Sequence, residues 1–473
     1  MSGGTFHTRV SRIPFHGLGL SLDVYQPDIF EVTEALARQG LTCGYLELFK
    51  AAEAALARVR AALPDVHLPY HGEGLWMTQP DWTTAYQLDE ELTLAAAHLR
   101  ALGSHWMTHE CAAKQMAGFS FGTYLPPLFT EASADVTAEH VSLVQEHLDR
   151  TAGETAPLLL LEMPPLTYFA VGAMPIPEFF RRVAERSGCG LVLDIGHLWT
   201  VYRYTRAWRR IPLSEFVSEF LDVFPLEQVV QIHVAGLAVH EKTAMHPIEP
   251  PLWIDAHGAP IPELLHDMLS QVLADRRLVN LKGMALEVDT KPVPLIVEEF
   301  RRFQERFGRA FVDSVASRAE GGPIQEARPS TPDRGDLLRR YRGYARMVSD
   351  EGMAPSADVE PAMLDLYRLS YLPHEILQWG GALADMFPQT CAQLAAAGVA
   401  LERFVPYWYR EPRAAERPYD FFLLKLALFT AFVREVLPAA ADIVEREAEE
   451  LGSAYRLACD QAAPCEPLAV TQP

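Results

Sequence analysis

Histidine and carboxylate side chains stand at or just after the ends of several short apolar runs in this chain. Nine residues share this position: His71, His109, Glu162, Asp194, His197, His233, Asp255, His257 and Glu287. A buried carboxylate is costly unless it is paired or bound to a cation, so these positions favour a metal site. Imidazole and carboxylate ligands without thiolate suit iron, manganese or zinc. Because nine ligands exceed what one ion normally takes, the set predicts two or three ions that share bridging carboxylates.

Each of these residues also has an ordinary structural interpretation. A single histidine at a strand end is more often a core or surface residue than a ligand, and an aspartate after a strand commonly caps the next helix. The metal interpretation rests on the recurrence of the position in six successive units. Histidines that lack it include His7, His16, His67, His98, His140, His147, His240, His246, His266 and His374. We expect these to be structural or solvated, although His16 and His240 could reach the same site.

Eight apolar runs alternate with amphipathic helical stretches through residue 306 and must position the candidate ligands. Strands are predicted at 17–20, 43–48, 66–71, 105–109, 158–162, 190–194, 229–234 and 284–288. This alternation fits an α/β protein with a (β/α)8 barrel, also called a TIM barrel. A doubly wound fold is less consistent, because no GxGxxG follows the first strand. In such a barrel the carboxyl ends of the strands form the functional face, so the candidate ligands should converge on one rim.

The remainder of the chain has a different pattern. We predict that residues 1–317 form the barrel as a metal-dependent catalytic domain, that 318–336, rich in Gly, Pro and charge, form a linker, and that 337–473 form a smaller all-α domain. This helical domain is expected to bind a peptide or a partner. Long aromatic and Pro-rich loops follow the third and fourth strands, and they either wall a substrate groove or pack against the helical domain.

Composition excludes several function classes. The 473 residues carry a formal charge of −21, from 41 Lys and Arg against 62 Asp and Glu, which argues against a nucleic-acid binder. The six cysteines are scattered without CxxC spacing, so neither a disulfide framework nor a zinc knuckle is expected. Apolar runs are too short for a membrane span, and the N-terminus lacks the apolar core of a signal peptide. We therefore expect a cytoplasmic protein that binds no membrane.

Nine short motifs, taken together and in order, resemble a known family. They are GLGLSLD, YLELF, PYHGEGL, THE, LLLEMPP, LVLDIGHL, QIHVAG, IDAHGAPI and ALEVD, within residues 14–306. The chain resembles the multinuclear non-haem iron-dependent oxidative enzymes (MNIO), whose fold is similar to the xylose isomerase-like TIM barrel. The resemblance implies two or three iron ions of mixed Fe(II) and Fe(III) state, with O2 as co-substrate. It also implies oxidative modification of a ribosomally synthesised precursor peptide, often at a Cys residue, as in RiPP natural product biosynthesis.

The resemblance implies roles for individual residues. Eight of them would be iron ligands: His71, His109, Glu162, Asp194, His233, Asp255, His257 and Glu287. Of these, His71, Glu162, His233 and Glu287 are the expected catalytic residues. Two departures concern asparagines of the family pattern. Met163 stands where the family has Asn after the fifth-strand Glu, and Ile195 and Gly196 stand where it has a pair of Asn after the sixth-strand Asp. These departures imply that an Asn ligand is either lost or replaced by the imidazole of His197, and the two alternatives differ in the number of irons expected.

Two other function classes remain open from the sequence. One is a divalent-metal-dependent sugar isomerase or epimerase, or a phosphodiester hydrolase, of the xylose isomerase-like barrel group. The other is a metal-binding interaction module. Many relatives of the suspected family work with a separate protein that presents the peptide, and we expect such a partner unless the helical domain replaces it.

Overall fold

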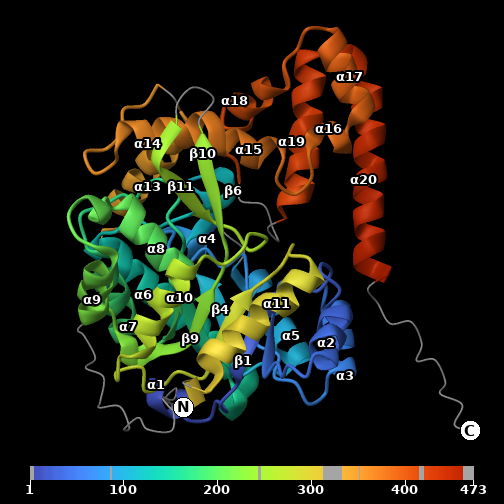
Figure 1. Ribbon diagram of the computed structural model, residues 1–473. Helices are drawn as coiled ribbons and strands as arrows, with labels where there is room; N and C mark the ends of the chain where they lie inside the picture. The colour runs from blue at the N-terminus through green and yellow to red at the C-terminus, as the bar shows by residue number, and fades with distance from the viewer. Residues whose placement is uncertain are drawn as a thin grey trace, which may run out of the picture.

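The computed structural model describes residues 5–85, 88–242, 247–309, 311–312, 333–350, 352–414 and 420–461. Eight parallel strands close into a barrel in the order β1-β12-β9-β8-β7-β4-β3-β2. Figure 1 shows the barrel in the lower part of the view, with β1, β4 and β9 labelled. Their bounds are β1 (Gly17–Leu22), β2 (Tyr45–Phe49), β3 (Tyr70–His71), β4 (Trp106–Glu110), β7 (Leu158–Glu162), β8 (Gly190–Asp194), β9 (Val229–Val234) and β12 (Gly283–Glu287). The predicted (β/α)8 barrel is confirmed, and each strand overlaps its predicted range.

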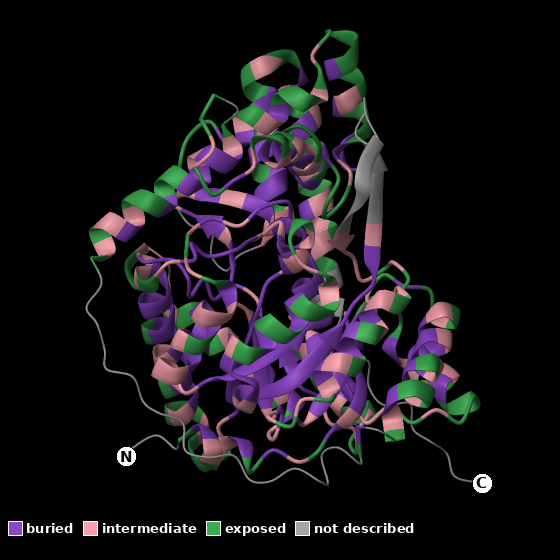
Figure 2. Cartoon of the chain, turned by 60° about the vertical axis from the view of Figure 1, so that its left-hand side comes forward, coloured by how far each residue is buried: buried purple, intermediate pink, exposed green. Residues whose placement is uncertain are grey.

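Amphipathic helices cover the outside of the barrel, and Figure 2 shows them with buried inner faces around buried strands. The main ones are α2 (Ile29–Arg38), α3 (Glu53–Ala62), α5 (Leu88–Leu102), α6 (Glu131–Ala152), α7 (Ile176–Ser187), α8 (Ile195–Tyr204), α9 (Leu213–Val223), α10 (Glu263–Leu273) and α11 (Val293–Phe303). Helix α7 illustrates the pattern, because Ile176, Phe179, Phe180 and Val183 form one buried stripe. It ends where Gly188 adopts a left-handed conformation, which glycine does at little cost.

The interior of the barrel has an apolar base and a polar middle layer. Helix α1 (Phe6–Val10) closes the base, where Phe6 and Val10 belong to the same buried cluster as Tyr45 and Trp106. Above it, the Thr108 hydroxyl donates to Glu47 Oε1 at 2.7 Å. The base therefore contains packed apolar side chains, and the carboxylates of the interior lie above it, toward the carboxyl ends of the strands.

Two hairpins extend the carboxyl end of the barrel at positions expected to be loops. The first joins β5 (Ala113–Met116) to β6 (Phe119–Leu125). Its two connecting residues both have positive φ, 51° for Ala117 and 85° for Gly118, which suits the tight turn of a hairpin. The second joins β10 (Leu237–Lys242) to β11 (Pro247–Asp255). Its prolines disfavour an ordinary strand, which is why the sequence pattern did not indicate it.

A helical region follows the barrel, as predicted. Its helices are α13 (Arg334–Ser349), α14 (Pro361–Leu366), α15 (Leu372–Leu377), α16 (Leu383–Met386), α17 (Pro388–Ala396), α18 (Phe404–Trp408), α19 (Phe421–Val436) and α20 (Ala441–Gln461). Most of the predicted linker, residues 318–332, lies outside the described residues. Helix α13 begins at Arg334, within the stretch expected as linker, and the Asp333 side chain caps it.

The helical region packs on the carboxyl end of the barrel (Figure 1). Trp408 Nε1 donates to the Ser120 carbonyl of β6 at 2.7 Å, and the Tyr341 hydroxyl accepts from Leu128 N at 3.2 Å. The loop after β3 joins this contact, since Arg334 donates to the Pro80 carbonyl at 2.9 Å. These contacts support packing against the helical region as the reason for the aromatic and Pro-rich loops. Across the described helices, none combines the length and apolar character that crossing a membrane requires.

Candidate metal centre

Glu162 ends β7 at the centre of the candidate site, between two histidines. Its Oε2 lies 3.2 Å from His71 Nε2, and its Oε1 lies 3.0 Å from His233 Nδ1. The register of β4 and β7 places Glu110 beside Glu162, and Glu110 Oε2 is 3.7 Å from His71 Nε2. Ligand atoms of His71, Glu110 and Glu162 lie within 4.8 Å of one another. This first ligand group includes Glu110, which sequence reasoning missed.

A second ligand group consists of Glu162, Asp194, His197 and Glu287, again with ligand atoms within 4.8 Å of one another. Asp194 does two things here: it caps α8 by accepting from His197 N at 2.6 Å, and its other oxygen, Oδ2, is buried without a hydrogen-bond partner among the described residues. The helix-cap and metal interpretations of this aspartate are therefore compatible. Glu162 belongs to both groups, so its carboxylate occupies a bridging position.

The end of β11 and the loop after it bring Asp255 and His257 to the same rim. His257 Nε2 lies 3.4 Å from Asp255 Oδ2 and 3.3 Å from Glu287 Oε2, and its Nδ1 is hydrogen-bonded to Asp289. Gly236 makes this approach possible, because a Cβ at that position would lie 1.9 Å from the Ala259 carbonyl oxygen. The glycine in QIHVAG thus lets the loop carrying IDAHGAP fold back against β9.

Met163, one of the residues that depart from the family pattern, orients His197. The Nδ1 of His197 donates to the Met163 carbonyl at 2.6 Å, which leaves Nε2 facing Asp194 Oδ1 at 3.7 Å and Asp255 Oδ2 at 3.5 Å. A metal-binding histidine commonly donates its other ring N–H to a backbone carbonyl in this way. The main chain of Met163, rather than its side chain, therefore contributes to the site.

His109 is the one predicted ligand that the structure does not bring into this arrangement. Its Nε2 accepts from Leu75 N at 3.1 Å and its Nδ1 donates to the Glu110 carbonyl at 2.8 Å. Both ring nitrogens are therefore committed within the protein. Residues on a strand point alternately to opposite faces, so Glu110 reaches the interior and His109 does not. Of the two histidines thought able to reach the rim, His16 precedes β1 at the opposite end of the barrel, and the side chain of His240, like His246, lies outside the described residues.

Glu47 is a second residue that sequence reasoning missed. It lies inside the barrel, fully buried, with Oε2 2.7 Å from His233 Nε2 and 3.0 Å from the Ser21 hydroxyl. Glu47 occurs in the middle of the strand YLELF rather than at its end, so a search of strand ends passes over it. A single acidic residue within an otherwise apolar strand is the signal that could have found it.

The electrostatics of the rim favour positive charge. Burial, together with the nearby charges of Asp255 and Glu162, raises the pKa of Asp194 to about 6, and burial raises the pKa of Glu287 to about 8. Burial alone would lower the pKa of His71, but Glu110 and Glu162 raise it to about 9. Surrounding carboxylates raise the pKa values of His197, His233 and His257 well above the ordinary range in spite of burial. Bound cations would supply the charge that protonated histidines supply here.

The donor set fits metal ions on a further observation. Within the part of the chain that the structure describes, four carboxylate oxygens of the rim are buried and accept no hydrogen bond: Glu110 Oε2, Asp194 Oδ2, Asp255 Oδ1 and Glu287 Oε2. A buried carboxylate oxygen without a partner is costly, and a coordinated cation would satisfy it. The mixture of carboxylate and imidazole ligands also suits iron.

Fold and site together define a (β/α)8 barrel with candidate metal-binding groups at the carboxyl ends of its strands. Residues 31–306, more than half of the chain, match the family model described as RiPP precursor modification enzyme MbnB/TglH/ChrH. The chain belongs to this family, which confirms the resemblance to the MNIO enzymes drawn from the sequence. The helical region lies beyond the matched residues.

Several proteins named UPF0276 protein are similar in sequence to part of this chain. That of Paraburkholderia phytofirmans is 30% identical over 186 residues, which is 38% of this chain and 52% of the relative. That of Rhizobium meliloti is 28% identical over 224 residues, 47% of this chain and 63% of the relative. One from Caulobacter vibrioides is 27% identical over 265 residues, which is 55% of this chain and 84% of the relative. This chain thus spans between half and two thirds of the first two relatives.

Solved structures with a similar chain path include endonuclease IV from Thermus thermophilus, with 16% identity, a TM-score of 0.37, and coverage of 63% of this chain and 99% of that one. A xylose isomerase-like TIM barrel protein from Mycobacterium smegmatis, in complex with magnesium, has 15% identity, a TM-score of 0.37, and coverage of 59% and 87%. At these values the similarity carries no argument about the reaction.

Proposed function

We propose that this protein is an iron- and O2-dependent oxidoreductase that modifies a residue, most simply a Cys, of a ribosomally synthesised precursor peptide. The observation that carries the proposal is the position of the buried Glu162, which two ligand groups share in a chain of the peptide-modifying family. Bound iron would supply the redox chemistry with O2, which protein side chains do not perform unaided.

The ligand groups indicate which residues would hold the ions. His71, Glu110 and Glu162 would hold one, and Asp194, His197 and Glu287 would share Glu162 with a second. Asp255 and His257 would complete the rim or hold a third ion. His233 would bind through Nδ1, which faces Glu162 and Glu287, while its Nε2 lies 2.7 Å from Glu47 Oε2 on the opposite side of the ring. Such outer partners fix the orientation and tautomer of a ligating imidazole.

The helical region is proposed to recruit the peptide, in place of a separate presenting protein. It contacts the β5–β6 hairpin, which follows β4 at the carboxyl end of the barrel, where the candidate ligands lie. Hydrogen exchange of the full chain tests this role. Added precursor peptide should protect amides within 334–461, and protection confined to the barrel would contradict it.

The test of the function uses full-length protein purified without O2. We expect two to three irons per chain and O2 uptake only when a Cys-containing precursor, sought in neighbouring reading frames, is present. The Glu162→Gln variant should lose both, whereas Glu34→Gln, which changes an exposed carboxylate on α2, should retain both. Full turnover of a sugar under anaerobic conditions with Mg²⁺ or Mn²⁺ would instead establish the isomerase alternative.

A further inference from the structure

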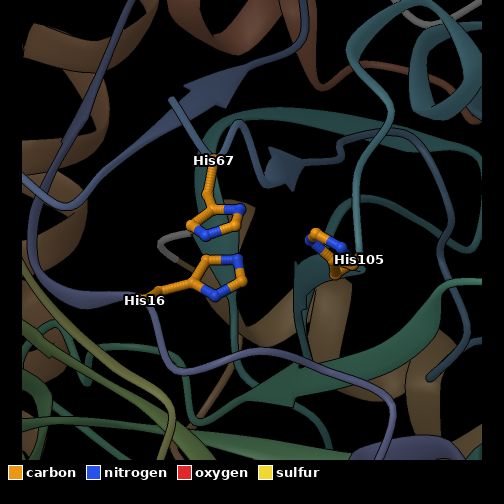
Figure 3. A group of neighbouring side chains, drawn as sticks. All are labelled: His16, His67 and His105. Carbon is orange, nitrogen blue, oxygen red and sulfur yellow. The ribbon is translucent and has the colours of Figure 1, made fainter. Parts of the chain in front are cut away.

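Three histidines gather at the amino end of the barrel, remote from the rim. His16 immediately precedes β1, His67 pairs with Tyr45 just before β3, and His105 immediately precedes β4 (Figure 3). One ring nitrogen from each lies within 4.8 Å of the others. We propose that His16, His67 and His105 form a second, independent metal site that binds one Zn²⁺ ion at the base of the barrel.

His16 is prepared for coordination in the structure as it stands. The residue is 3% exposed, and its Nδ1 donates to the Pro14 carbonyl at 2.8 Å. This hydrogen bond fixes the tautomer and leaves a lone pair on Nε2. That Nε2 atom is buried and has no hydrogen-bond partner among the described residues. A ring held by its other nitrogen, with an unsatisfied buried lone pair, is the arrangement that ligating histidines commonly have.

The other two rings are placed to complete the site. His67 stacks on His16 with centroids 4.2 Å apart, and His105 lies edge-on to both, at 5.2 Å from His16 and 5.4 Å from His67. His67 and His105 are only partly buried, and the outer torsion of a histidine side chain is broad. The proposed site requires these two rings to rotate until one nitrogen of each meets a point shared with His16 Nε2.

The surroundings favour neutral imidazoles and decide the class of ion. Burial lowers the pKa of His16 to about 3 and also lowers those of His67 and His105, so each ring keeps a lone pair at neutral pH. Nitrogen ligands without a carboxylate suit Zn²⁺ better than Mg²⁺ or Ca²⁺. The positive charge of Lys282 acts on His16 and that of Arg60 acts on His67, and these charges favour an anion such as hydroxide or chloride as the fourth ligand.

The location of the three histidines determines how the ion reaches them and what its binding does to the fold. A cavity of about 410 Å³, lined in part by Arg12, Ile13, Ser104 and His105, opens beside the cluster and offers a path for the ion. The three histidines come from segments far apart in the chain. A shared ion would therefore tie the segment after α1 to the starts of β3 and β4, and would stabilise the folded chain in proportion to its occupancy.

The experiment measures bound Zn²⁺ in full-length chains loaded with Zn²⁺ and dialysed. The double variant His67→Gln/His105→Gln should bind one ion fewer than the unaltered chain, and the matched variant His147→Gln/His374→Gln should bind the same number. The Glu162→Gln chain, altered only at the rim, should retain the ion at the base, and with Co²⁺ it should show the visible absorption of a tetrahedral imidazole site. Equal Zn²⁺ in the two double variants, or an unchanged Co²⁺ spectrum when His67→Gln/His105→Gln is added to Glu162→Gln, would overturn the proposal.

Discussion

Glu47 Oε2 lies 2.7 Å from His233 Nε2, inside the barrel and beneath the carboxylates that end the strands. Burial opposes the charge on Glu47, but His233 lowers the pKa of the carboxyl to about 2, so it is ionised. The imidazole is thereby held with Nδ1 toward Glu162 and Glu287. The pair has the form of a carboxylate that orients a metal-binding histidine.

Replacing Glu47 by Gln should weaken metal binding by about 10- to 100-fold without unfolding the barrel. The amide keeps the size of the side chain but removes the charge that stabilises and orients His233. Iron per chain, measured after dialysis against a weak chelator, checks the effect, with Glu34→Gln as the control. Metal retention equal to that of the control would show that Glu47 only fills the interior.

His197→Asn should retain most of the bound metal and His197→Ala should lose it. Asparagine offers an oxygen ligand from the same first turn of α8, whereas alanine offers none and leaves the unpartnered Oδ2 of Asp194 uncompensated. The comparison is made by metal content and by activity on the precursor peptide. If both variants kept full metal content, His197 would be a structural residue held by the Met163 carbonyl.

Gly236→Ala should displace Asp255 and His257 and reduce metal content, because the new Cβ would lie 1.9 Å from the backbone oxygen of Ala259. The loop must move, since backbone cannot yield as a side-chain end can. Gly343→Ala on α13 is the control, as nothing lies within 4 Å of its added Cβ. Comparable metal content in the two variants would contradict this role for Gly236.

Acid should weaken the contact between barrel and helical region through His140 on α6. Its Nδ1 donates to the Met77 carbonyl at 2.8 Å, and its Nε2 accepts from Arg334 at 3.1 Å, so protonation breaks the second bond. Burial lowers the pKa of His140 from 6.5 to about 4. Between these values the unfolded chain binds a proton that the folded chain does not, so this stability is complete above pH 6.5 and is lost as pH falls toward 4.

Urea unfolding at pH 7 and pH 5 measures this effect. The unaltered chain should lose up to about 2 kcal/mol more than His140→Gln over that interval, at about 1.4 kcal/mol for each pKa unit. Gln can donate to Met77 and accept from Arg334 without titrating. An identical loss in both chains would place the acid sensitivity at other buried histidines.

The sequence predicted the barrel and most of the rim because both depend on local patterns. Apolar runs ending in His, Asp or Glu mark the carboxyl ends of parallel strands, and closure of the barrel brings those ends together. Glu47 and Glu110 were not predicted, for different reasons. Glu47 is inside a strand, and Glu110 follows His109 directly, so that only the register of β4 against β7 decides which of the two side chains faces inward.

The histidine cluster at the base could not be found from strand ends at all. His16, His67 and His105 precede their strands, and the same rule that gathers residues at the carboxyl ends gathers these at the opposite face. Their proximity depends on barrel closure rather than on any spacing in the chain. The two hairpins were also missed, since prolines in β11 and the short turn at Ala117 and Gly118 obscured the strand pattern.

The shared position of Glu162 has a consequence for how the rim will respond to substitution. A carboxylate that serves two ligand groups couples them, so filling one group changes the charge and geometry that the other presents. The losses of metal-binding free energy caused by substituting His71 and by substituting Asp194 should therefore not add. The double variant should lose less metal-binding free energy than the sum of the two single losses. A double-mutant cycle across Glu162 would measure the cooperativity between the two positions directly.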